Sequence, residues 1–136
     1  MNVPLLVAGS LSLLAAAVHG AGGEALVVRR LSPESLPPTR LGGPGMTRLM
    51  IRATWHMTTV GFLTVGSALV VAGTAIDGDT AQGIGLVAAT AATGFAAIAV
   101  AAGLAHVRRK GIRAMFDHLA PVLLTAVAVL AWVGIA

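Results

Sequence analysis

Histidine is the residue type of this chain best suited to chemistry, and it occurs four times, as His19, His56, His106 and His118. Neutral imidazoles joined by one carboxylate bind zinc, iron or manganese. Two imidazoles, or an imidazole and a methionine sulfur, can hold the iron of haem b. Glu24 follows His19 by five residues and supplies the carboxylate. We therefore predict either a metal site formed by His19, Glu24, His56 and His118, or a haem site with ligands from His19, His56 and His118.

A plainer interpretation of the same residues competes with this one. Histidines at the membrane interface can bond to backbone carbonyls or lipid headgroups, and Glu24 can simply neutralise Arg52. Arg52 and His56 are four residues apart and share a helix face. His106 adjoins "VRRK" and is expected to face headgroups. Trp55 is either an aromatic-belt anchor or a site residue, whereas Trp132 is expected in the belt on the other side.

The elements that would position these residues are four apolar helices. Of the 136 residues, 57% are hydrophobic and 10% are charged, a balance typical of membrane proteins. The apolar segments cover approximately residues 3–22, 49–75, 82–106 and 114–135, and each is long enough to cross a bilayer. They lack the alternation of membrane strands. We predict an all-α protein, residues 1–136 forming one transmembrane four-helix bundle. Gly20, Gly22 and Gly23 should loosen the end of the first helix, and Pro121 should kink the fourth.

The distribution of positive charge predicts an orientation. All nine Lys and Arg lie in or beside the first and third connections, and the second connection carries Asp77 and Asp79. The positive-inside rule makes the basic side cytoplasmic, with both termini on the non-cytoplasmic side of a multi-pass protein of the cell inner (cytoplasmic) membrane. One histidine per helix then lies in the cytoplasmic half, together with Glu24, Arg52 and Asp117. A cleaved signal peptide over residues 1–23 is an alternative, but no basic residue precedes its apolar run.

Several functions are disfavoured by what the sequence lacks. Without cysteine, thiolate sites are impossible, and no catalytic serine–histidine–acid, phosphate-loop or paired-carboxylate pattern occurs, so enzyme activity is not expected. Nucleic acid is not expected as a partner because topology accounts for the basic residues. The lipid bilayer is the expected partner, and small residues such as Gly85, Ala89 and Thr93 could pack against another membrane protein or a second copy.

Three functions therefore stay open. The first is the metal- or haem-binding bundle described above. The second is an accessory or structural subunit of a larger membrane complex. The third is a proton-coupled transport component in which His19, Glu24 and His56 titrate, although the outer half of each helix lacks polar stations.

Three short motifs carry a resemblance. They are "HGAGGE" at residues 19–24, "WHMTT" at residues 55–59 and "DHLAPVLL" at residues 117–124. The chain resembles an uncharacterised family of small bacterial four-span membrane proteins with HxxxGE and WH motifs and a histidine before the last span. The resemblance implies no activity, but it implies that His19, Glu24, Trp55, His56 and His118 occupy that family's recurrent polar positions. The "DH" pair departs from the family's arginine-rich lead-in, so the match is weakest at His118.

Overall fold

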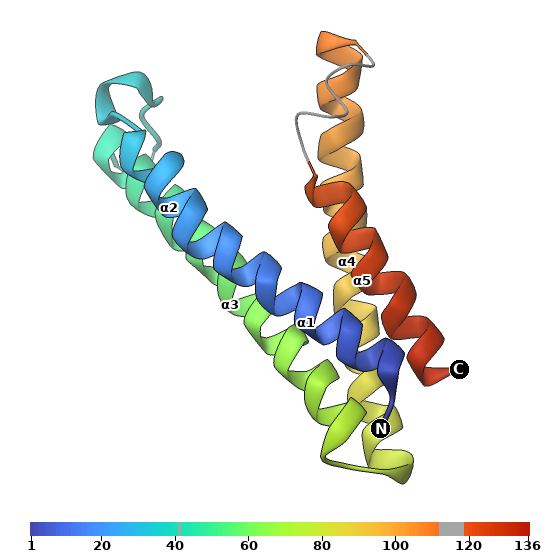
Figure 1. The fold of residues 1–136 in the computed structure, drawn as a ribbon. Helices are drawn as coiled ribbons and strands as arrows, with labels where there is room; N and C mark the ends of the chain where they lie inside the picture. Colours follow the sequence, from blue (N-terminus) through green and yellow to red (C-terminus); the bar gives the residue numbers. More distant parts are fainter. Residues whose placement is uncertain (41, 112–118) are drawn as a thin grey trace. The chain divides into compact units, whose positions relative to one another are not determined.

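The computed structural model describes residues 1–40, 42–111 and 119–136, and Figure 1 shows that they form long helices. Helix α1 (Val3–Ala17) continues through a π-helical turn, η1 (Val18–Gly22), into α2 (Gly23–Leu26) and the 3₁₀ turn η2 (Val28–Arg30). A second 3₁₀ turn, η3 (Pro33–Ser35), precedes α3 (Pro44–Thr74), α4 (Gly78–Lys110) and α5 (Ala120–Ile135). No strand occurs in this part of the chain, where the one β-like feature is an isolated bridge between Thr39 and Gly42.

Three stretches are long and apolar enough to cross a membrane: Val3–Arg30, Pro44–Thr74 and Gly78–Lys110. The fourth helix, α5, is apolar but has 16 residues. The predicted all-α class with four helices is therefore confirmed over the described residues.

The helix ends differ from the predicted ones. The first helix continues beyond its glycines to Leu26, but it leaves the regular α-helical form at Gly20 and Gly22, which lie in the π turn, and Gly23 begins α2. Helix α3 begins at Pro44 rather than near residue 49, since proline at the start of a helix loses no hydrogen bond. Helix α4 runs past the predicted 82–106 at both ends. Helix α5 begins at Ala120, so Pro121 lies in its first turn, and the predicted kink involves residues before Leu119 that lie outside the described ones.

The chain divides into two compact units, residues 1–13 with 64–136 and residues 14–63. The first unit has a core of small and aliphatic side chains, which includes Leu69, Ala89, Val127 and Ala131. Within it α1 and α3 approach backbone to backbone. A Cβ atom at Gly9 would lie 2.8 Å from the carbonyl oxygen of Gly66, and one at Gly66 would lie 2.9 Å from that of Gly9. Glycine at both positions therefore permits the close packing that holds membrane helices together.

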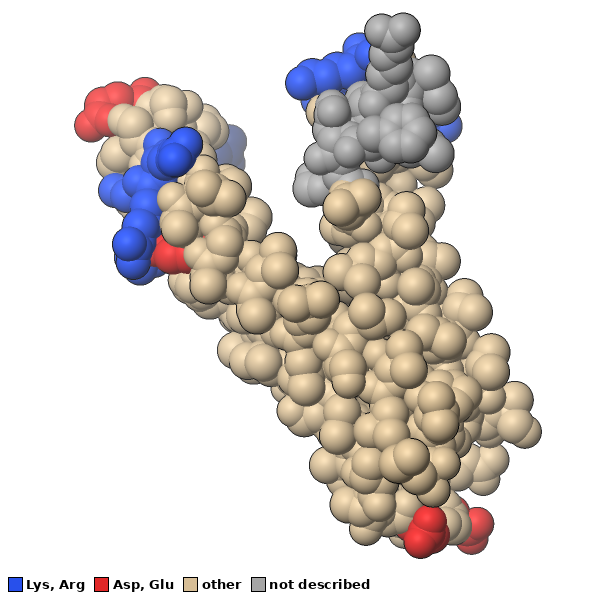
Figure 2. Space-filling model, viewed as in Figure 1, with Lys and Arg blue, Asp and Glu red and all other residues tan. Residues whose placement is uncertain are grey.

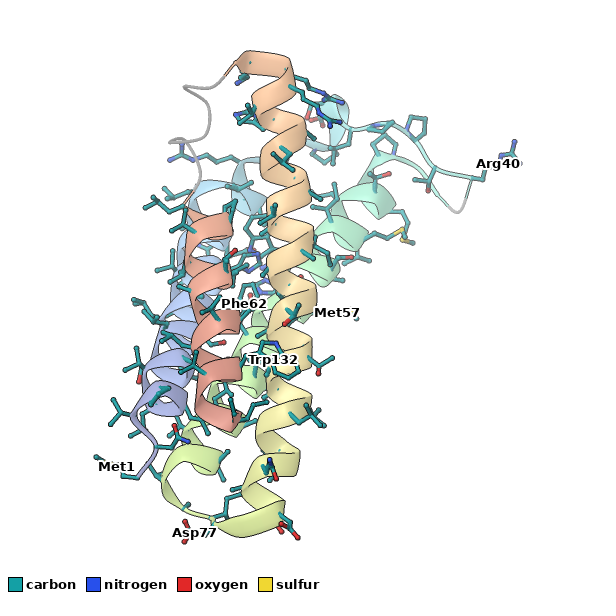
Figure 3. All side chains as sticks on the ribbon, turned by 90° about the vertical axis from the view of Figure 1, so that its right-hand side faces the viewer. Met1, Arg40, Met57, Phe62, Asp77 and Trp132 are labelled. Atoms are coloured by element: carbon teal, nitrogen blue, oxygen red, sulfur yellow. The ribbon has the colours of Figure 1, made fainter. Side chains whose placement is uncertain are left out.

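Polar side chains fasten the ends of this first unit. The Asn2 backbone N–H donates to the carbonyl of Gly73 at 2.9 Å, and its side-chain amide donates to the carbonyl of Gly134 at 2.6 Å. Trp132, labelled in Figure 3, is 43% exposed and donates through Nε1 to Thr93 Oγ1 at 2.9 Å. Trp132 is thus both exposed, as a belt residue would be, and bonded to α4.

The second unit, residues 14–63, contains the end of α1, the turns η1 to η3, and the first part of α3. Here α2 and α3 run side by side in opposite directions (Figure 1). We call this pair of helices the hairpin, and Figure 2 shows Lys and Arg gathered over its end. Arg40 extends from the connection that precedes α3, and Asp77 lies in the turn between α3 and α4 (Figure 3).

Candidate functional site

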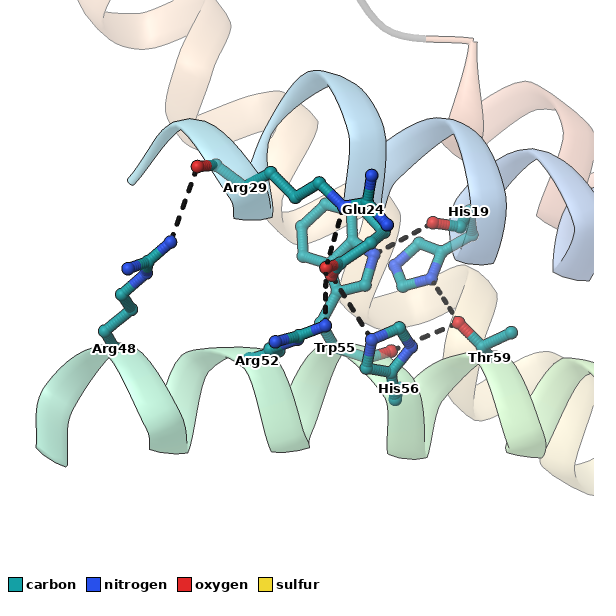
Figure 4. A network of polar contacts seen from close by, with 8 residues as sticks. All are labelled: His19, Glu24, Arg29, Arg48, Arg52, Trp55, His56 and Thr59. Carbon is teal, nitrogen blue, oxygen red and sulfur yellow. Dashed lines mark hydrogen bonds and ion pairs between the residues drawn. The ribbon is translucent and has the colours of Figure 1, made fainter. Parts of the chain in front are cut away.

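A π turn sets the register of the first two candidate residues. The five residues of η1, "VHGAG", include His19, and Glu24 follows in α2. A π turn bonds residue i to residue i+5, so residues five apart come to lie over one another. In a regular α-helix His19 and Glu24 would diverge, whereas here both side chains meet α3 (Figure 4). π turns of this kind often mark functional positions.

The His19 ring is held on three sides by residues of α3. Its Nδ1 lies 3.0 Å from Thr59 Oγ1. The imidazole stacks on the indole of Trp55, with ring centroids 4.3 Å apart and planes 12° apart. Phe62 meets it edge-on at 5.5 Å. The ring is therefore fixed in position and plane by neighbours on another helix.

The Thr59 hydroxyl indicates which nitrogen of His19 carries the proton. That hydroxyl donates to the carbonyl oxygen of Trp55 at 3.3 Å, so its single proton is used. When the hydroxyl makes that bond, the Thr59 oxygen accepts from the Nδ1–H of His19. This tautomer places the lone pair of the neutral ring on Nε2, the nitrogen that binds a metal in many histidine sites.

Trp55 joins the two helices rather than standing alone at the interface. Its Nε1–H donates to the carbonyl oxygen of His19 at 2.9 Å. The indole lies so close to α2 that a Cβ atom at Gly23 would be 2.2 Å from Trp55 Cζ2. Any larger residue at position 23 would displace the indole, and Trp55 belongs to the site.

Glu24 is the centre of a separate group of charges. Its residue is 8% exposed, and its carboxylate lies 2.8 Å from Arg52 Nη2 and 3.5 Å from Arg29 Nε. His56 Nε2 lies 3.3 Å from Oε2 of the same carboxylate. The predicted pairing of Glu24 with Arg52, and the shared face of Arg52 and His56, are both confirmed.

A shallow groove of 360 Å³ opens beside His19. It is mainly apolar and is lined by His19, Met50, Ile51, Thr54, Trp55 and Thr58. Glu24, Arg52 and His56 are not among its lining residues. The groove thus combines a fixed imidazole, an indole face and a methionine in one place.

The predicted ligand set is only partly brought together. His19, Glu24 and His56 all lie where α1 and α2 meet α3 (Figure 4), whereas His118 lies outside the described residues. Among the residues that the structure describes, no group of three or more His, Asp or Glu could hold a metal ion. The physical reason is that two guanidinium groups occupy Glu24, while Thr59 and Trp55 hold His19. A site for a bare zinc, iron or manganese ion therefore gains no support.

Sequence reasoning missed Thr59, Phe62 and Gly23 as parts of the site. Thr59 follows Trp55 by four residues and shares its helix face, so "WHMTT" held a signal for it. Nothing in the sequence indicates that Gly23 meets an indole. Comparison of the chain with protein-family models, with curated proteins and with solved structures gives no match, so the resemblance drawn from the motifs remains a prediction.

Proposed function

We propose that this protein is a haem-binding module of the cell inner membrane, in which Nε2 of His19 binds the iron of haem b. The observation that carries the proposal is the fixed His19 ring, bonded at Nδ1 to Thr59 and placed at the edge of an apolar groove. A histidine ligand is commonly held in this way, with its other ring nitrogen bonded to an oxygen acceptor.

Haem fits these residues better than a bare metal ion does. A bare ion needs three or four protein ligands, whereas haem iron brings four ring nitrogens and needs one or two axial ligands. The groove supplies His19 and Met50, and a His–Met pair is an axial set found in haem proteins. Its apolar lining suits the porphyrin ring, and because the groove is open, a ring larger than its volume can lie across it.

The proposed membrane placement agrees with the same chemistry. With the arginine-rich connection on the cytoplasmic side, as the positive-inside rule predicts, the groove lies in the cytoplasmic half. Met50 lies between Arg48 and Arg52 along α3, so one end of the groove would lie close to headgroup level, where the propionates of a bound haem could be placed. Polar propionates and an apolar ring would then each face a suitable environment.

The test is a titration of the purified protein in detergent with haemin, followed by the Soret band. Wild type should saturate at one haem per chain, and His19→Ala should lose the band. His56→Ala should keep it, because His56 contacts Glu24 and does not line the groove. His106→Ala, in α4, is the matched control.

Met50→Leu separates the ligand role from apolar packing. Leucine keeps a similar volume but has no sulfur, so the band should persist with a shift toward a five-coordinate or water-bound spectrum. Absence of any Soret band in wild type, or an unchanged band in His19→Ala, contradicts the proposal.

A further inference from the structure

Beyond the haem proposal, we propose that Arg29, Arg48 and Arg52 form a binding site for the phosphate headgroup of an anionic phospholipid. These three arginines lie where η2 meets the start of α3, and none of them lines the groove beside His19. The inference uses the membrane placement proposed above but is independent of haem.

Positive charge exceeds negative charge around Glu24. Two guanidinium groups, those of Arg29 and Arg52, contact its carboxylate, and Arg48 lies about one helical turn before Arg52 on α3 (Figure 4). Arg29 contacts Glu24 through Nε and Arg52 through one terminal nitrogen, so each keeps donors that the carboxylate does not occupy. Both side chains stay exposed, at 73% and 55%. Exposed donors with surplus charge suit a phosphate group.

Arg48 is held in a fixed position. Its Nη2 donates to the carbonyl oxygen of Arg29 at 3.4 Å, which holds it against η2. A bond to a backbone carbonyl leaves the charge of Arg48 uncompensated. Arg48 is therefore held against the backbone of Arg29 by a bond that does not neutralise its charge.

The length of α3 places the arginines at the depth of lipid phosphates. Arg52 precedes Thr74, the last residue of α3, by 74 − 52 = 22 residues, or about 33 Å of helix. The hydrocarbon core is about 30 Å thick. When the Thr74 end lies at one boundary, Arg52 and Arg48 therefore reach the phosphates of the other leaflet. The exposed side chains of Leu26, at the end of α2, and Leu49, in α3, suit acyl chains.

The experiment measures lipid binding to the full chain in mild detergent by native mass spectrometry. Phosphatidylglycerol should bind more tightly than phosphatidylcholine. One arginine near a membrane surface contributes about 1 kcal/mol, which is about fivefold in affinity. Arg29→Gln and Arg48→Gln should therefore each weaken phosphatidylglycerol binding about fivefold.

The matched control is Arg40→Gln, which removes the same charge from the connection before α3, where Arg40 extends away from the helices (Figure 3). It should leave the affinity unchanged. Arg48→Lys keeps the charge but loses the planar set of guanidinium N–H donors, so it should give an intermediate affinity. This variant also distinguishes a loss of binding from a folding defect in Arg48→Gln. Equal binding of the two lipids, an equal loss in Arg40→Gln, or displacement of phosphatidylglycerol by an equal concentration of inorganic phosphate overturns the proposal.

Discussion

At the scale of single residues, the contacts of His19 and Glu24 assign them different tasks. His19 has aromatic and hydroxyl neighbours, whereas Glu24 has cationic ones. Ionisable groups inside a membrane protein are costly unless they are paired. Glu24 is paired and stabilises the hairpin, and His19 keeps one nitrogen for a ligand in the proposed site.

The Thr59 hydroxyl should matter for haem affinity. Thr59→Val keeps the branched shape but removes the acceptor of His19 Nδ1–H, so the ring loses its fixed tautomer. Loss of such a supporting bond lowers metal affinity about 10–100-fold, and haemin titration should show a decrease of this order. Thr74→Val is the control, because the Thr74 hydroxyl bonds to the carbonyl of Val70 in its own helix and Thr74 does not line the groove. Equal affinities of the two variants would rule out this role of Thr59.

The Glu24 carboxylate should matter for stability. Glu24→Gln removes the charge that two arginines and His56 share, and hydrogen bonds to charged groups contribute about 1.5–3 kcal/mol. The exposed arginines reduce the effect, so we expect a loss of about 1–2 kcal/mol, measured by thermal unfolding in detergent. Glu34→Gln, at an exposed carboxylate that accepts from Ser32, should change stability little. A larger loss in Glu34→Gln than in Glu24→Gln would contradict the account.

Contacts within one helix of this site could be predicted from the sequence, whereas contacts between helices could not. The shared face of Arg52 and His56 is set by local helix geometry, so spacing was enough to predict it. His19 and Trp55 are 36 residues apart in the chain, and their stacking depends on how their two helices are aligned. Residue spacing within one helix cannot specify that alignment, so Trp55 was open to two interpretations.

At the scale of the elements, the π turn η1 is the feature that positions the site. It brings His19 and Glu24 to the same side of the first helical run and lets Gly23 meet the indole of Trp55. The sequence predicted the helices well because hydropathy is a local property. It did not predict that the first helix continues from Gly23 to Leu26, where Gly23 lets the indole of Trp55 pack closely.

Position 23 should tolerate a larger side chain far less well than position 22. In Gly23→Ala the new methyl group would lie 2.2 Å from Trp55 Cζ2 and 2.7 Å from Nε1, atoms of a rigid ring. The indole must move, and overpacking of this kind costs about 1–3 kcal/mol. Gly22→Ala meets nothing within 4 Å and should be neutral or stabilising. Melting curves of the two variants in one detergent test this difference, and equal melting temperatures would contradict it.

At the scale of the whole molecule, the charge distribution predicts how the chain crosses the membrane. Three stretches are long and apolar enough to span. The side on which each connection lies follows only from the positive-inside rule. Hydropathy gives the segments but carries no information about sides, so orientation needs its own experiment.

The chain contains no cysteine, so a single introduced cysteine is unique. Asp79→Cys, at the start of α4, should react with a membrane-impermeant maleimide on cells whose outer membrane has been permeabilised and whose inner membrane is intact. Arg40→Cys, in the arginine-rich connection, should react only after the inner membrane is permeabilised. The reverse pattern would contradict the proposed orientation and would place the His19 groove in the other leaflet.

The central claim is that His19 holds haem b within the membrane, and haem content is its most direct test. The protein would be purified from membranes of haem-sufficient cells, and bound haem measured by the pyridine haemochrome spectrum relative to protein. We predict close to one haem b per chain for wild type and His56→Ala, and almost none for His19→Ala. Wild-type protein without haem, or with haem that His19→Ala retains, would contradict the claim.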